Sequence, residues 1–473
     1  MTGYRIFAIL ITVALGFAIS GCALIHPTDP YREMDRPKRM NSSVSVNAAQ
    51  PVVFHDSLTL SKAIEIALAN NPGIAAAAWE VERAAAQQDM TVGELLPRLN
   101  GTGGYLHSLD PQRLIAARNS QDPGVFSSDI ASADIVLQMP LFSSGRLINN
   151  VGASTLLEQA AKHRFARNKE ELIYNVTSIF YSILAQRRLV ESVEYSQQTL
   201  QEHLKRVIML VESQKAAQVD RLRTEVRLAD VTQRLVQETN SLDIFQRLLA
   251  NLLGIVERDI TNLTIQGELE DVVAGPVPET DSIVNVAQLN RGDYLAEKAT
   301  LEAQAKTVDA ARAAHWPTFS LQTSYGYRWA IDDEAGVSGV SLSEDIGRIG
   351  IVFDIPFFEG GRVRAKVRAE QARMAEDQAR LRQLEQQMQL EIETALLNRQ
   401  AASHRLDATG KAVDQATESL RIEREKYELG RGAIVDILDA QSALLDAQTN
   451  HFRALADLHI AQAQLRLATG SDQ

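Results

Sequence analysis

The amino-acid sequence predicts a mainly helical protein that also forms a transmembrane β-barrel, to which each chain contributes four β-strands. Long antiparallel coiled-coil helices are expected to continue from the strands as a helical barrel. Three observations predict this fold class: an internal two-fold sequence repeat, four runs of alternating polar and apolar residues, and two very long stretches of helical periodicity. Four strands cannot close a barrel, so three copies are expected to complete one of about 12 strands.

Composition supports long helices and excludes a nucleic-acid-binding surface. The 473 residues include 48 basic and 60 acidic side chains, which give a formal net charge of −12, whereas nucleic-acid interfaces are usually basic. Alanine, leucine, glutamine, glutamate and arginine dominate long stretches, and no proline occurs from residue 141 to residue 275. Because proline breaks helices, its absence permits very long ones.

The N-terminus has the features of a lipoprotein signal peptide. The mostly apolar run Ile6–Ile19 is too short for a membrane span, and the residues that follow it up to Cys22 resemble a bacterial lipobox. We expect residues 1–21 to be removed and the Cys22 thiol to carry lipid. Ala23 stands where an aspartate would signal retention in the inner membrane, which favours the outer membrane. The alternatives are an ordinary secretory signal and an uncleaved anchor.

Cys22 is also the only cysteine of the chain. A disulfide within the chain and a metal site with several cysteine ligands are therefore excluded.

An internal repeat organises the rest of the chain. Corresponding residues lie 220 positions apart before the loop that joins each pair of strands, and 216 positions apart after it. The pairs are Pro97 with Pro317 and Tyr105 with Tyr325 at the first offset, and Pro140 with Pro356 and Asp220 with Asp436 at the second. Matches in the same order with one small change of offset indicate duplication rather than chance.

The repeat sets the predicted domain boundaries, which begin with the signal peptide at 1–21. The segment 22–57 is polar and contains prolines, so it is interpreted as the lipid anchor and an extended strap, with disorder as the alternative. The remaining divisions are repeat 1 at 58–266, a linker at 267–281, repeat 2 at 282–470 and a tail at 471–473.

Four runs with a period of two predict β-strands, because alternate side chains of a strand point to opposite faces. Each has one apolar and one polar face over about 10 residues, as a membrane barrel requires. Two amphipathic hairpins on a soluble core are the alternative, but aromatic residues near both ends of the second hairpin resemble interfacial belts. The predicted strands cover about 98–107, 131–140, 318–330 and 347–356.

Between the strands the apolar period becomes helical. Two long helices are predicted at Arg146–Gln214 and Arg362–Tyr427, and a helix of about 70 residues reaches about 105 Å. Antiparallel coiled-coil hairpins that form a tube fit these lengths. A spectrin-like cytosolic rod is the alternative, but it would lack the signal peptide and the strands. Shorter helices are predicted at about 73–95, 220–253, 284–314 and 434–468.

From Leu58 to Gly470 the chain resembles the TolC family of outer-membrane efflux and secretion channels. The resemblance rests on the two turns that begin at Pro140 and Pro356 and on the run from Tyr427 to Gln441. It implies a trimer with a 12-stranded barrel in the outer membrane, a long helical barrel in the periplasm and a closed periplasmic tip. The lipobox points to the lipoprotein members, many of which serve pumps of the resistance-nodulation-division type.

The resemblance also implies a gate at the periplasmic tip. The matching positions are Tyr427, Asp436 and Asp439 in repeat 2 and Asp220 in repeat 1, while the family arginine falls on Gly432, next to Arg431. Asp436 and Asp439 lie three residues apart, hence on one helix face, and three copies would form a ring of carboxylates that attracts cations. As the alternative, Asp436 and Asp439 only oppose the positive end of a helix.

No enzyme motif is found. A phosphate-binding Gly-rich loop and a Gly-x-Ser-x-Gly elbow are both missing, and His451 and His459 are interpreted as solvated or packed. The acidic residues 332–334 and 344–345 are assigned to a solvated loop, with a cation site as the alternative. We expect no catalytic residue, cofactor or metal, and no enzyme.

The predicted function is a passive trimeric exit duct for small molecules, driven by an inner-membrane pump of the resistance-nodulation-division or ATP-binding-cassette type through a periplasmic adaptor protein. It is expected in the cell outer membrane, anchored by lipid and extending into the periplasm. Protein export in a type I secretion system is one alternative. A non-conducting, lipid-tethered coiled-coil scaffold is another, and a hydrolase is disfavoured.

Overall fold

The structure is a computed structural model that describes residues 58–114, 126–255, 265–269, 280–331 and 343–470. The predicted signal peptide, Cys22 and the strap lie outside the described residues, as do the acidic residues 332–334, the tail and most of the linker.

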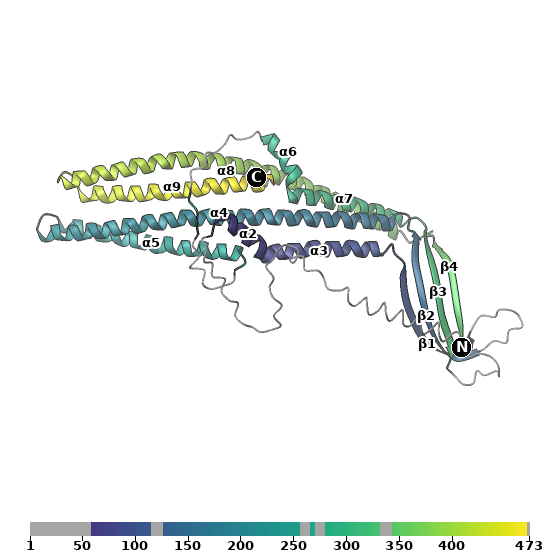
Figure 1. Ribbon diagram of the computed structural model, residues 1–473. Helices are drawn as coiled ribbons and strands as arrows, with labels where there is room; N and C mark the ends of the chain where they lie inside the picture. The colour runs from purple at the N-terminus through teal and green to yellow at the C-terminus, as the bar shows by residue number, and fades with distance from the viewer. Residues whose placement is uncertain (1–57, 115–125, 256–264, 270–279, 332–342, 471–473) are drawn as a thin grey trace.

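The chain is elongated, with a β-sheet at one end and two long helical hairpins that run side by side toward the other (Figure 1). The elements divide between the two repeats. Those of repeat 1 are α2 (Leu60–Asn70), α3 (Pro72–Gly93), β1 (Arg98–Arg113), β2 (Phe126–Phe142), α4 (Arg146–Glu212) and α5 (Gln218–Leu252). Those of repeat 2 are α6 (Thr280–Asn290), α7 (Gly292–Ala313), β3 (Thr318–Ala330), β4 (Ser343–Asp354), α8 (Arg362–Glu428) and α9 (Ile434–Thr469).

The four strands form one antiparallel sheet in the order β1-β2-β3-β4. The two repeats join at its centre, where β2 pairs with β3, so β1 and β4 are the edges. Within the chain each edge strand pairs on one side only, which leaves its other row of backbone N–H and C=O groups for a further strand.

The strands differ from the predicted ones at their ends. β1 and β2 continue to Arg113 and back to Phe126, because their pairing resumes after a register shift between His107 and Gln112. The prediction stopped β1 at about residue 107, where the alternating run ends, and Pro111 beyond it cannot donate a backbone hydrogen bond to a sheet. β4 begins at Ser343, earlier than predicted, and ends at Asp354, before Pro356, which has no N–H to donate to a sheet.

One face of the sheet is apolar and exposed. Residues paired across the strands, such as Ile135 with Tyr325 and Leu321 with Ile351, fall on this face. Ile349 is 79% exposed on it and Phe353 is 64% exposed. An apolar surface as wide as a whole sheet is unfavourable in water and is suited to a membrane. Among the helices of the described ranges, none is both long enough and apolar enough to cross a bilayer.

The long helices α4 and α8 have 67 residues each. Leu172, Val176 and Ile183 of α4 are buried against α2 and the end of α5. Their spacings of four and seven residues place them on one helix face. Fully burying such an aliphatic side chain stabilises the fold by about 1.5–3 kcal/mol.

Each repeat has a break between two helices at its start. Asn71 separates α2 from α3 with φ −65° and ψ 124°, and Arg291 separates α6 from α7 with φ −64° and ψ 121°. The prediction of one helix over about 284–314 was therefore wrong. Arg291 lies 220 residues after Asn71, the offset of the repeat, but Gly292 stands where repeat 1 has Pro72. The proline that marks the first break is thus missing from the second.

Two glycines make these breaks possible. Gly254 after α5 and Gly470 after α9 lie 216 residues apart and have φ of +69° and +63°. A Cβ on Gly254 would lie 2.4 Å from the carbonyl oxygen of Asn70, and one on Gly470 would lie 2.9 Å from the backbone nitrogen of Arg291. The end of the short hairpin helix can therefore approach the break only without a side chain.

A buried arginine holds the second break. The Arg291 side chain is 1% exposed and pairs with Asp293 at 2.6 Å and with Glu391 of α8 at 2.8 Å. It also donates to the carbonyl of Ala468 in α9 at 3.3 Å. Although burial acts the other way, the charges of Arg291 and Arg167 hold the pKa of Asp293 below its usual range. Arg291 thus ties α7, α8 and α9 together where the two hairpins of the chain meet the short helices.

Arg291→Met is expected to lower the free energy of unfolding by about 3 kcal/mol, because it leaves two carboxylates without their buried partner. The matched control is Arg312→Met, since Arg312 pairs with Asp309 at 3.1 Å with both side chains about half exposed, and a loss below about 1 kcal/mol is expected there. Thermal unfolding in detergent measures both. Equal shifts of Tm for the two variants would contradict the role of Arg291.

Candidate functional site at the hairpin tips

The predicted gate residues gather at the hairpin tips. The turn 213–217 joins α4 to α5 and the turn 429–433 joins α8 to α9, and both lie at the end of the molecule away from the sheet (Figure 1). An apolar cluster holds the two hairpins together near this end. It includes Val207 of α4, Val231 of α5 and Ile434 and Leu438 of α9.

The two shorter helices of the hairpins begin in the same way. Asp220 accepts a hydrogen bond from the backbone N–H of Ala217 at 3.3 Å, and Asp436 accepts one from Ala433 at 3.2 Å. An alanine at the helix start has no side-chain acceptor of its own, so the carboxylate three residues later satisfies the backbone and opposes the positive end of the helix. Asp436 therefore has the helix-terminal contact that the alternative described for Asp436 and Asp439, and Asp220 makes the same contact in repeat 1. The place of Asp436 and Asp439 in a ring of three chains stays a prediction.

Asp439 and Arg431 are exposed near the same tip. Asp439 lies three residues after Asp436, so the two carboxylates share a helix face. Arg431 lies in the turn, where its backbone N–H donates to the carbonyl of Lys426 at 2.8 Å. Its side chain forms no ion pair within the described part of the chain.

Tyr427 connects the two hairpins. It is half-buried on α8, contacts the apolar cluster at the tip, and lies 5.9 Å from His203 of α4 between ring centroids. Burial raises the pKa of Tyr427, and the nearby negative charge of Asp220 raises it further, while Arg206 acts in the opposite direction. Tyr427 and Asp220 are thus within electrostatic range, and the contact of Tyr427 with α4 runs through His203.

Polar contacts farther from the tips were not predicted from the sequence. Arg234 of α5 donates to Asp446 of α9 at 2.7 Å and to Thr449 at 2.9 Å. Gln441 of α9, which is 9% exposed, donates to the side chain of Ser196 in α4 at 3.3 Å. We call the contacts of Arg234 with Asp446 and Thr449 the interhairpin clamp. It lies 16 residues beyond the start of α5, or about 24 Å from the tip.

A sequence signal for these contacts does exist. Gln441 and Thr449 flank the buried Leu445 at a spacing of four residues, so they occupy the apolar stripe of α9 and are buried with it. A polar side chain in such a stripe needs a hydrogen-bond partner. The pattern indicates that a partner exists without saying which helix supplies it.

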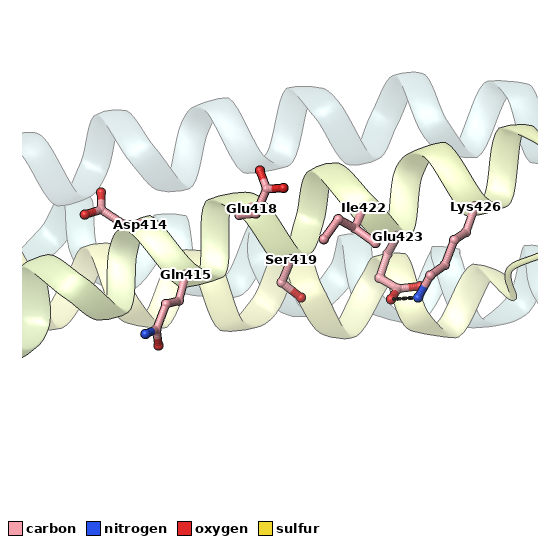
Figure 2. A pocket seen from close by; sticks show the side chains of 7 residues that line it. All are labelled: Asp414, Gln415, Glu418, Ser419, Ile422, Glu423 and Lys426. Atoms are coloured by element: carbon pink, nitrogen blue, oxygen red, sulfur yellow. Dashed lines mark hydrogen bonds and ion pairs between the residues drawn. The ribbon is translucent and has the colours of Figure 1, made fainter.

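A shallow groove with acidic residues in its lining runs along α8 next to the tip (Figure 2). Asp414, Glu418 and Ile422 line it, and Glu423 pairs with Lys426 at 2.7 Å at the end nearest the tip. The lining residues recur every three or four positions and all belong to α8, so within the described residues the groove is one exposed helix face. Two of its carboxylates, Glu418 and Glu423, already pair with Arg421 and Lys426 of the same helix.

The chain is similar in sequence and in structure to known proteins. A sequence model of the family described as "Outer membrane efflux protein" matches residues 63–255 and 283–471. The chain is 23% identical over 403 residues to "Outer membrane protein TolC" of Vibrio cholerae, covering 85% of this chain and 88% of that one. It is 22% identical over 464 residues to "Probable outer membrane lipoprotein SilC" of Salmonella typhimurium, covering 93% of both.

Among solved structures, the Campylobacter jejuni CmeC outer membrane channel superposes with a TM-score of 0.75 at 18% identity, covering 87% of this chain and 85% of that one. The likeness confirms the predicted fold class, with long helices and four antiparallel strands per chain.

Loss of the interhairpin clamp is expected to loosen the tip. Arg234→Met removes charge-assisted hydrogen bonds that are partly exposed, so the two hairpins should separate locally at a cost lower by about 1 kcal/mol. Amide hydrogen exchange at the start of α9 should then be about fivefold faster.

The matched control is Arg405→Met. Arg405 pairs with Asp457 at 2.6 Å, but this ion pair joins α8 to α9 within one hairpin. Exchange at the start of α9 should be close to that of the unchanged protein. The same acceleration in both variants would mean that the clamp has no special part in holding the hairpins together.

Proposed function

Because this chain belongs to the outer membrane efflux protein family, we propose that three copies of it form the passive exit duct of a tripartite efflux system. The resemblance to TolC-type channels that the sequence indicated is confirmed, and the chain is an outer-membrane efflux channel subunit. The trimer, the passive mechanism and the partners are the proposal, and so is the transport of small molecules without chemical change.

The proposal of a trimer is based on the sheet. It has four strands, two unpaired edges and one exposed apolar face. Within a bilayer no water satisfies backbone groups, and each unpaired one costs several kcal/mol. Pairing β1 of one copy with β4 of the next satisfies both edges, and three copies give about 12 strands, enough for a barrel with an open lumen.

The length of the hairpins supports the proposal of a periplasmic duct that contacts partner proteins. At about 1.5 Å per residue, α4 and α8 each reach about 100 Å from the sheet. A wall of such helices leads from the barrel toward the inner membrane, where a pump supplies the energy. The exposed groove on α8 supports the presence of a partner, because a periplasmic adaptor could pack its side chains into it.

The proposal of an aperture is based on the residues at the hairpin tips. In a trimer Asp436 and Asp439 would contribute six carboxylates around one axis, with Tyr427 and Asp220 between the hairpins and Arg431 at the turn of α8 and α9. A ring of carboxylates attracts cations and repels anions. The interhairpin clamp lies between this ring and the sheet. The tips can therefore move apart and open the aperture while the contacts of the clamp remain formed.

Cys22 carries the proposal of a lipid anchor. The residues up to Cys22 match a lipobox, and the name of the SilC relative includes the word lipoprotein. Each buried CH₂ group of an acyl chain contributes about 0.8 kcal/mol to membrane binding.

Asp436→Asn combined with Asp439→Asn is expected to reduce the preference for cations over anions severalfold, because the charge of the ring is lost. Asparagine keeps a side-chain oxygen for the N–H of Ala433, so the start of α9 is retained. Reversal potentials in planar bilayers under a salt gradient measure the selectivity. An unchanged permeability ratio in open channels would reject the aperture assignment.

Cys22→Ser is expected to abolish metabolic labelling with radioactive palmitate, because serine cannot form the thioether that carries the lipid. Immunoblotting confirms that the variant is produced. Labelling that persists in the serine variant would show that the lipid is attached elsewhere.

A further inference from the structure

A histidine lies between the two hairpins near their tips. His203 is in α4, nine residues before the end of that helix. Its Nε2 atom is buried and has no hydrogen-bond partner within the described residues. Its ring contacts that of Tyr427 in α8, with the two planes tilted by 60°. A buried ring nitrogen without a partner is unusual, because buried polar atoms are nearly always hydrogen-bonded.

The charges nearest to His203 are positive. Arg206 lies almost one turn further along α4, and Arg424 approaches from α8; both disfavour a proton on the ring, as does burial, which has the largest effect. The pKa of His203 is therefore below its usual range. From α8 the ring also meets Tyr427, whose own neighbour on α5 is the carboxylate of Asp220.

Besides these charged groups, apolar side chains pack around Tyr427. α5 contributes Leu228 and Val231, and α9 contributes Ile434 and Leu438, to the cluster that Tyr427 contacts. A protonated His203 would thus place a third positive charge beside two arginines at the edge of an apolar cluster. Burying a charge without a partner is unfavourable, and the buried Nε2 of a protonated ring can gain a water partner only if the packing around it loosens.

We propose that His203 is an acid-sensitive switch, which loosens the packing of the α8–α9 hairpin on α4 when its ring gains a proton. Its consequence for transport rests on the proposed function, in which separation of the tips opens the aperture. The direction follows from proton linkage. A histidine whose pKa is lower in the packed state stabilises that state fully above the value of the solvated ring, about 6.5, and this stabilisation is lost as the pH falls below it.

Hydrogen exchange at the tip tests the proposal on the full-length channel in detergent. Between pH 7.5 and pH 5.5, exchange at the start of α9 should rise about tenfold after correction for the intrinsic pH dependence of exchange. His203→Phe keeps an aromatic ring that cannot gain a proton, so its exchange should stay near the neutral-pH value. His203→Gln gives a second uncharged side chain in case phenylalanine disturbs assembly.

His404→Phe is the matched control, since His404 is an exposed histidine on α8 and its loss should leave the pH response intact. A pH response that persists in both His203 variants would overturn the proposal, as would the absence of a response in the unchanged protein. Bilayer conductance is recorded on the same samples. Exchange that responds to pH while conductance does not would uphold the switch and instead reject the aperture assignment.

Discussion

The structure depends on one constraint, which is that backbone groups at a sheet edge must be paired when no water is present. The chain supplies four strands and leaves one edge on β1 and one on β4. The apolar face of the sheet is the surface that would be in contact with lipid, so these edges lie where an unpaired N–H or C=O costs most. Assembly of several copies is therefore a requirement of the single chain's own geometry. Assembly of the sheets also positions the helices, because β2 continues into α4 and β4 continues into α8.

The internal repeat explains how one chain builds two hairpins of the same design. Both repeats break their first helix at equivalent residues, Asn71 and Arg291, and both end their last helix at a glycine with positive φ. The ion pairs differ along the length of the molecule. Near the breaks, Arg291 is 1% exposed and joins helices of repeat 2, with its partners Asp293 and Glu391 26% and 36% exposed. At the clamp, Arg234 is 29% exposed and its partner Asp446 is 58% exposed. A contact shielded from water resists opening more than an exposed one, so mobility is expected to increase toward the tip.

The sequence predicted most of the fold because its periods are strong. Alternation identified all four strands, and helical spacing placed α4 and α8 almost to their ends. The residues after His107 were left out of the predicted strand, because a bulge that restores pairing has no clear pattern of its own. The break at Arg291 has no proline, although the repeat offset from Pro72 points to it. At the tip, Asp220 and Asp436 were correctly placed at helix starts. Arg234 and Asp446 are 212 residues apart, and periodicity does not tell which stripe faces which. A single histidine such as His203 carries no pattern at all.

Crosslinking between sheet edges tests the central claim most directly. In a variant with serine in place of Cys22, pairs of cysteines introduced along β1 and β4 are the only thiols, because the chain has no other cysteine. If β1 of one copy pairs with β4 of the next, oxidation in outer membranes should give covalent trimers for pairs in register, and no higher species. Monomers alone for every pair along the two strands would contradict the closed barrel, and so would ladders longer than three chains.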